Sequence, residues 1–79
     1  MALIREIVGF ARDDTFVSIR AFLEEKISDL RPLIDYGDDY ELYAGSYEVS
    51  DAYRDRVATI LGVTLQPDID YFIEASQST

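Results

Sequence analysis

The chain has to build its core without a covalent cross-link, because none of its 79 residues is cysteine. Folding at this length buries only about 60% of the surface that the unfolded chain exposes, so the core is small. Apolar residues nevertheless make up 48% of the sequence, which is more than a disordered chain contains. We therefore expect one folded domain, residues 1–79, and a homodimer in which self-association completes the small core.

Residues 15–30 carry the clearest helical pattern in the sequence. Asp14 or Thr15 can accept hydrogen bonds from the free N–H groups of the first turn. Arg31 ends the predicted helix, because the residue that precedes a proline is disfavoured in the α conformation. The apolar residues recur every three or four positions and would form one buried stripe; they are Phe16, Ile19, Phe22, Leu23, Ile27 and Leu30.

Residues 51–62 predict a second helix. Ser50 is a favourable N-cap residue, and Gly62 suits the left-handed position that follows a helix. The apolar residues on its buried side are Ala52, Tyr53, Val57, Ile60 and Leu61. Across both helices, the residues that we expect in the core are Phe16, Phe22, Leu23, Ile27, Val57, Ile60 and Leu61.

The two ends of the chain carry mixed signals. Residues 2–12 place apolar side chains on one side at a helical period, but Gly9 and the β-branched residues leave a strand open. Residues 69–75 are dense in residue types that favour strands. A short helix that begins at Pro67 is the alternative for this segment, and we expect the strand.

The central segment fits two structures. The first is a hairpin over residues 39–50 with a two-residue turn at Ala44 and Gly45. It would place four side chains on one face, those of Tyr40, Leu42, Tyr47 and Val49. The second is a helix over residues 36–47, which the glycines in this range weaken. We favour the hairpin, joined by residues 69–75. The expected fold is α+β, with two or three helices packed on a small antiparallel sheet; the alternative is an all-α domain.

Charge is distributed unevenly along the chain, whose 16 acids and 7 bases give a net charge of −9. Residues 1–31 have a net charge of −1, whereas residues 32–79 have a net charge of −8. Nucleic acids and anionic membranes repel a negative surface, so we expect the chain to bind neither directly. A homodimer should form through residues 1–31, because two strongly negative regions repel each other.

The amino-terminal segment lacks the features of a secretion signal. Arg5 and Glu6 interrupt it where a signal peptide has an unbroken apolar stretch. No stretch of the sequence approaches the ~20 consecutive apolar residues of a transmembrane helix. We therefore expect a cytoplasmic protein, in the cytoplasm of the host cell if a phage encodes it.

Catalytic and metal-binding signatures are missing from the sequence. It has no histidine and no cysteine, and these are the commonest general base, the strongest nucleophile and the usual ligands of transition metals. The acids of the central segment do not have the spacing of a calcium-binding loop. A domain of this size rarely encloses a cleft in which two carboxyl groups hydrolyse a substrate. We expect no enzymatic activity, no cofactor and no bound metal.

Residues 35–53 hold six acids and five tyrosines but no lysine or arginine. One interpretation is a solvated face that only increases solubility. The missing countercharge favours a partner-binding surface instead, as do the tyrosines, which are enriched at protein interfaces. On a strand, alternate carboxylates would lie about 6.6–6.8 Å apart, and a basic groove built for a phosphate backbone could accept such a row. The predicted partner-binding residues are Asp35, Asp38, Asp39, Glu41, Tyr43, Glu48 and Asp51.

In its size, its charge and its interleaved acids and tyrosines, the chain resembles phage-encoded inhibitors that mimic nucleic acid. Among these it resembles anti-CRISPR proteins that act on type I complexes. The resemblance implies a non-enzymatic inhibitor that occupies a positively charged nucleic-acid channel of a bacterial defence complex and blocks target DNA. Anti-CRISPR proteins share no common motif, so the resemblance assigns no role to single residues. The alternatives are an acidic regulatory module, such as an antitoxin-like protein that neutralises a basic partner, and a small phage structural or assembly protein.

Overall fold

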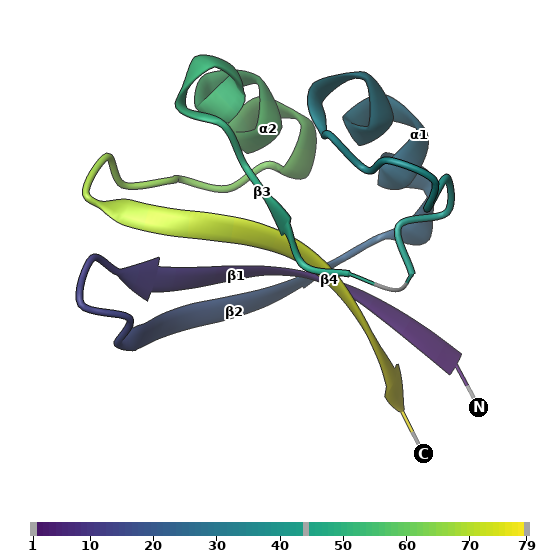
Figure 1. Ribbon diagram of the computed structural model, residues 1–79, viewed down its shortest axis with the longest axis horizontal. Helices are drawn as coiled ribbons and strands as arrows, with labels where there is room; N and C mark the ends of the chain where they lie inside the picture. Colours follow the sequence, from purple (N-terminus) through teal and green to yellow (C-terminus); the bar gives the residue numbers. More distant parts are fainter. Residues whose placement is uncertain (1, 44, 79) are drawn as a thin grey trace.

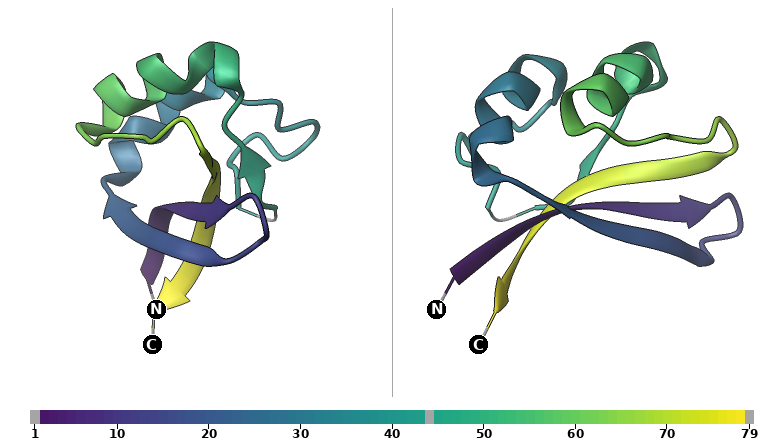
Figure 2. Two further views of the ribbon diagram at one scale, coloured as in Figure 1. Left: turned by 90° about the vertical axis from the view of Figure 1, so that its left-hand side faces the viewer. Right: turned by 180° about the vertical axis from the view of Figure 1, so that it is seen from behind.

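The centre of the fold is a four-stranded antiparallel sheet in the order β2-β1-β4-β3 (Figure 1). The computed structural model describes residues 2–43 and 45–78. The strands are β1 (Ala2–Ala11), β2 (Phe16–Phe22), β3 (Tyr47–Glu48) and β4 (Ile69–Ser78). Two short helices, α1 (Ile27–Leu30) and α2 (Arg54–Leu61), lie on one side of this sheet (Figures 1 and 2). The α+β prediction is confirmed, and the all-α alternative is wrong.

Residues 2–22 form a β-hairpin at the amino-terminal end of the chain. β1 pairs with β2 on one edge and with β4 on the other, in both cases antiparallel. The helix that the spacing of residues 2–12 favoured is therefore wrong, and the strand that the sequence left open is the structure that forms. The turn places Asp14 at a φ of 67°, and it closes where the Ala11 amide donates to the Thr15 carbonyl at 2.8 Å.

The predicted helix over residues 15–30 is wrong in its first half, which is β2. Helical structure begins only with the 3-10 turn η1 (Glu24–Lys26), continues through α1 and ends in the 3-10 turn η2 (Arg31–Leu33). Phenylalanine, valine and isoleucine favour strands as well as tolerating helices. Their spacing suited either structure, and the pairing with β1 decided between them.

The predicted helix over residues 51–62 is confirmed. It starts as the 3-10 turn η3 (Asp51–Tyr53) and continues as α2. The Ser50 hydroxyl oxygen accepts a hydrogen bond from the Ala52 amide at 3.2 Å, which is the predicted cap. Gly62 adopts the left-handed conformation with a φ of 67°, where a glycine has no Cβ to strain the backbone.

The central segment forms neither the predicted hairpin over residues 39–50 nor the helix over residues 36–47. Only the two residues of β3 pair with β4, where Tyr47 lies opposite Ile73 and Glu48 opposite Phe72. Residue Ala44 of the predicted turn lies outside the described residues. Leu42 has a φ of 57° and is fully buried, so the chain turns inward before it could pair as a strand. The predicted strand over residues 69–75 is confirmed as part of the longer β4.

The core lies between the helices and the inner face of β1 and β4. Its buried members are Ile7, Ile27, Leu30, Leu33, Ile34, Leu42, Val49, Val57, Ile69, Tyr71 and Ile73. Of the predicted core residues, Ile27 and Val57 are buried, whereas Phe22, Ile60 and Leu61 are partly buried and pack against the core. The burial of Phe16 and Leu23 was predicted wrongly, because these side chains are 54% and 64% exposed. Phe16 lies on β2, which is an edge strand of the sheet, and Leu23 follows that strand.

Candidate functional site

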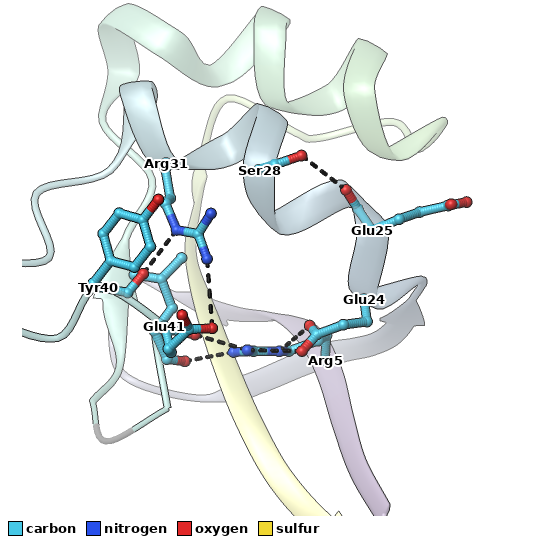
Figure 3. A network of polar contacts seen from close by, with 8 residues as sticks. Arg5, Glu24, Glu25, Ser28, Arg31, Tyr40 and Glu41 are labelled. Carbon is cyan, nitrogen blue, oxygen red and sulfur yellow. Dashed lines mark hydrogen bonds and ion pairs between the residues drawn. The ribbon is translucent and has the colours of Figure 1, made fainter.

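The segment that leads into β3 is held by a buried arginine (Figure 3). Arg5 on β1 is 2% exposed. Its Nε and Nη2 donate to the Glu24 carboxylate at 2.6 and 3.1 Å. Its Nη1 donates to the Leu42 carbonyl at 2.6 Å, and Nη2 also donates to the Glu41 carbonyl at 2.7 Å. Because charge-assisted hydrogen bonds are roughly twice as strong as neutral ones, this arginine fixes the position of the loop on the sheet.

A second arginine holds the same loop from the helical side (Figure 3). The Nε of Arg31 donates to the Tyr40 carbonyl at 2.7 Å, and its guanidinium lies 4.0 Å from the centre of the Tyr40 ring. Its Nη2 lies 3.6 Å from the Glu41 carboxylate. The ring of Tyr43 lies 4.4 Å from the guanidinium carbon of Arg5. We call Arg5, Arg31 and the three carbonyls of residues 40–42 the arginine clasp.

Beyond the clasp, the surface is hollowed between residues 32–35 and residues 46–53. The hollow has a volume of about 520 Å³. Asp35 and Glu48 lie on its two sides, and the rings of Tyr47 and Tyr53 also line it. Asp35 and Glu48 are exposed, and neither forms a hydrogen bond or ion pair with any residue that the structure describes.

Two further hollows adjoin this one around β3. One of about 310 Å³ is lined by Glu48, Asp51 and Asp70, with Arg12 at its side. The other, of about 380 Å³, lies on the sheet face away from the helices. It combines two phenyl rings with three carboxylates, and these residues are Phe10, Phe72, Asp14, Asp70 and Glu74. Each pair of hollows has at least one lining residue in common. The first and second share Glu48 and Ser50, the first and third share Ser46, and the second and third share Asp70. The three hollows therefore form one continuous region.

This region, which we call the β3 acidic surface, has six carboxylates: Asp14, Asp35, Glu48, Asp51, Asp70 and Glu74. Two of them have a cationic partner. Arg54 Nη2 donates to Asp51 Oδ1 at 2.7 Å, and Arg12 Nε lies 3.7 Å from Asp70 Oδ1. The surface therefore keeps an excess of negative charge even after these internal pairs are counted.

The structure places the predicted partner-binding residues in three settings. Asp35, Glu48 and Asp51 lie on the β3 acidic surface. Asp38 is exposed in the loop. The other three make contacts within the protein: Asp39 accepts from the Tyr47 hydroxyl at 2.5 Å, Glu41 faces Arg31, and Tyr43 stacks on Arg5. The predicted row of carboxylates on one strand does not form, because β3 contains a single acid.

Sequence reasoning missed the contributions of Asp14, Asp70 and Glu74. The signal for the last two was present, since they alternate along β4 with buried Tyr71 and Ile73. Side chains two positions apart on a strand lie on the same face of the sheet, here the face opposite the core. Asp14 could not be found in the same way, because only the turn of the β1–β2 hairpin brings it to the end of the sheet.

Hydrogen bonds shift the pKa values of two groups in this region. The Tyr47 hydroxyl donates to Asp39, and this bond to a carboxylate raises the pKa of Tyr47 above its usual value. The Arg54 guanidinium, which donates to Asp51, lowers the pKa of that carboxyl. Within the described ranges, no group of three or more acids is placed to hold a metal ion. In the same part of the chain, no helix has the length and apolar character needed to cross a membrane.

Comparisons of the chain with protein-family models, with curated proteins and with solved structures give no match.

Proposed function

We propose that the protein is a non-enzymatic inhibitor that binds a basic, nucleic-acid-binding surface of a bacterial defence complex of the CRISPR type. The observation that carries the proposal is that arginines near the acidic surface bind backbone carbonyls and leave several carboxylates without a cationic partner. The clasp directs three hydrogen bonds to backbone carbonyls of residues 40–42. Asp35, Asp38 and Glu48 are left without a countercharge among the described residues.

The clasp matters because it gives the negative charges a defined arrangement. Residues 34–43 and 45–46 have no regular secondary structure, and a loop of this kind would lose conformational entropy on binding. Two arginines already hold its backbone in the free protein. The chain therefore presents preorganised carboxylates to a partner, and electrostatic steering by such a surface speeds association with a basic groove.

The number of carboxylates also supports a charged partner. A single exposed ion pair contributes about 0.2–1 kcal/mol, so no one residue of the β3 acidic surface can hold a partner alone. Six carboxylates acting together can contribute a few kcal/mol. The hollow between Asp35 and Glu48 adds the rings of Tyr47 and Tyr53, on which an arginine or lysine side chain can stack. Such side chains line the channels that bind nucleic acid.

The experiment is a competition between this protein and duplex DNA for a purified type I surveillance complex. The test variant reverses three charges, Asp35→Lys, Asp38→Lys and Glu48→Lys, none of which has a partner within the described chain. Asp39 and Glu41 are left unchanged, because their contacts with Tyr47 and Arg31 would confuse loss of binding with loss of structure. We expect the unaltered protein to block DNA loading at 0.1 M salt and the test variant to lose about tenfold or more in potency.

The matched control reverses three exposed acids on the helical side, Glu25→Lys, Asp29→Lys and Asp55→Lys. It changes the net charge by the same amount and should block DNA loading as well as the unaltered protein does. Inhibition should also weaken steeply as salt is raised to about 1 M, where the Debye length is about 3 Å. If both triple variants lost the same potency, net charge alone would explain the inhibition and the position of the charges would not matter. Failure of the unaltered protein to reduce DNA loading would reject the proposal.

A further inference from the structure

The opposite edge of the sheet, β2, is covered by none of the described helices or strands. The strand order ends at β2. No hydrogen bond from another described segment reaches its outer backbone groups. Edge strands with unpaired N–H and C=O groups are templates for a further strand, and most proteins protect them with charges, prolines or very short length. β2 is seven residues long, has no proline and carries one charge, Arg20.

The side chains of β2 are also unusually exposed. Phe16, Val17 and Ile19 are 54%, 46% and 53% exposed, and every residue of the strand except Phe22 is exposed. On the inner face, a hollow of about 360 Å³ separates β2 from residues 63–66. Both faces and the outer edge of the strand are therefore open to solvent, and association would remove this apolar surface from water.

We propose that β2 pairs antiparallel with β2 of a second copy of the chain, which joins two four-stranded sheets into one. Charge selects this partner. β2 contains no acid, whereas residues 32–79 have a net charge of −8. Two chains that each carry −9 can approach with less repulsion along a strand that itself contains no carboxylate than along the β3 edge.

Symmetry defines the register of this pairing. When all seven residues of both strands are paired around a two-fold axis normal to the sheet, Ile19 lies opposite Ile19 of the second copy. Ser18 then lies opposite Arg20, so the two arginines do not face each other. Residues directly opposite in an antiparallel pair lie on the same face and are close enough to interact. The pairing is small compared with a standard protein interface, so we expect a weak dimer that forms at high protein concentration.

The test uses two variants at the symmetry axis, Ile19→Lys and Ile19→Glu. Each one alone places like charges opposite each other and should raise the dimer dissociation constant about tenfold or more. An equimolar mixture of the two places opposite charges at the axis and should restore dimers. Sedimentation equilibrium measures the mass in each case. Tyr53→Lys, at an exposed position near the other edge of the sheet, is the control and should dimerise like the unaltered protein.

Amide hydrogen exchange provides a measurement that needs no variant. Outward-facing amides of β2 should exchange more slowly as the protein concentration rises, while exchange at β3 stays the same. The proposal is overturned if the unaltered protein remains a monomer at the highest concentration reached, or if the single variants dimerise as it does. A mixture of the two Ile19 variants that stays monomeric would also overturn it, because the strands would then not meet at Ile19.

Discussion

The two edges of the sheet are built in opposite ways. β3 contains only two residues and lies among six carboxylates, whereas β2 has seven residues, three large exposed apolar side chains and no acid. Short length and surrounding like charges both protect an edge strand against pairing with a copy of itself. A longer strand with a single positive charge has neither protection.

This difference separates two kinds of contact within one small domain. Binding at the β3 edge would depend on charge and therefore on salt, while pairing at the β2 edge would depend on backbone hydrogen bonds and apolar area. The sheet itself connects the two, since β4 pairs with β3 on one side and with β1 on the other.

The largest effect should come from Ile73, which is fully buried on β4 opposite Tyr47 of β3 and Ile7 of β1. The substitution Ile73→Ala should lower the free energy of unfolding by about 4 kcal/mol, since it leaves a cavity in the core. Leu23→Ala, at the end of the β2 edge, should lower it by less than about 1 kcal/mol because the side chain is largely exposed. Urea denaturation measures both, and similar losses would mean that the β2 edge is covered.

The second comparison uses two arginines. Arg5→Ala should lower the free energy of unfolding by about 2–3 kcal/mol, because the buried Leu42 carbonyl would lose its donor. The loss stays at this level since the other partner, Glu24, has a side chain that is 57% exposed and can be hydrated. Arg20→Ala on β2 should change stability by less than about 0.5 kcal/mol. Urea denaturation measures both variants. If Arg5→Ala lowered the free energy of unfolding as little as Arg20→Ala does, the clasp would not hold the loop.

A third prediction concerns the ionisation of Tyr47 on β3. Its pKa is raised, first by the hydrogen bond to Asp39 and then by burial. Asp39→Ala removes the acceptor and should bring the pKa of Tyr47 back towards its usual value of 10.0. Asp38→Ala, one residue away, should leave it unchanged. Carbon-13 NMR of the labelled tyrosine rings through an alkaline titration distinguishes the two variants.

The smallest effects on stability should appear at acidic pH, and they should come from one carboxyl group near each edge of the sheet. Hydrogen bonds from Arg54 and from Thr15 lower the pKa values of Asp51 and Asp13 from the usual 3.8. Each therefore contributes stability that is complete above about pH 3.8 and is lost as the pH falls through the lowered value. Asp51→Asn and Asp13→Asn should each flatten the fall in stability below pH 3.8. A side-chain carboxyl in either position that titrates at or above 3.8 by NMR would contradict this.

The parts of the fold that could be predicted are those with local signals. The helix over residues 51–62 has an N-cap serine and a glycine stop, and both act within one turn of the helix. The strand over residues 69–75 is rich in β-branched and aromatic side chains. The predicted helix over residues 15–30 failed where spacing was its main support, because Phe16, Val17 and Ile19 suit an edge strand equally well.

The candidate site was only partly predictable for a similar reason. Asp35, Glu48 and Asp51 could be selected from the run of acids that contains them. Their meeting with Asp70, Glu74 and Asp14 depends on the pairing of β3 with β4 and on the hairpin turn, which join residues far apart in the sequence. The contacts of Glu41 and Tyr43 within the protein depend on Arg31 and Arg5, and the sequence does not indicate that Arg5 is buried.

The sequence by itself determined the second helix, the last strand and the strong negative charge of the carboxyl-terminal part, and it favoured the α+β class over the all-α alternative. These follow from residue type and from contacts within a few positions. Only the tertiary structure decided that residues 16–22 are a strand, that Arg5 is buried and that the acids surround β3. The physical reason is that strand pairing and the desolvation of an arginine depend on partners distant in the chain, and local preference is too weak to choose those partners.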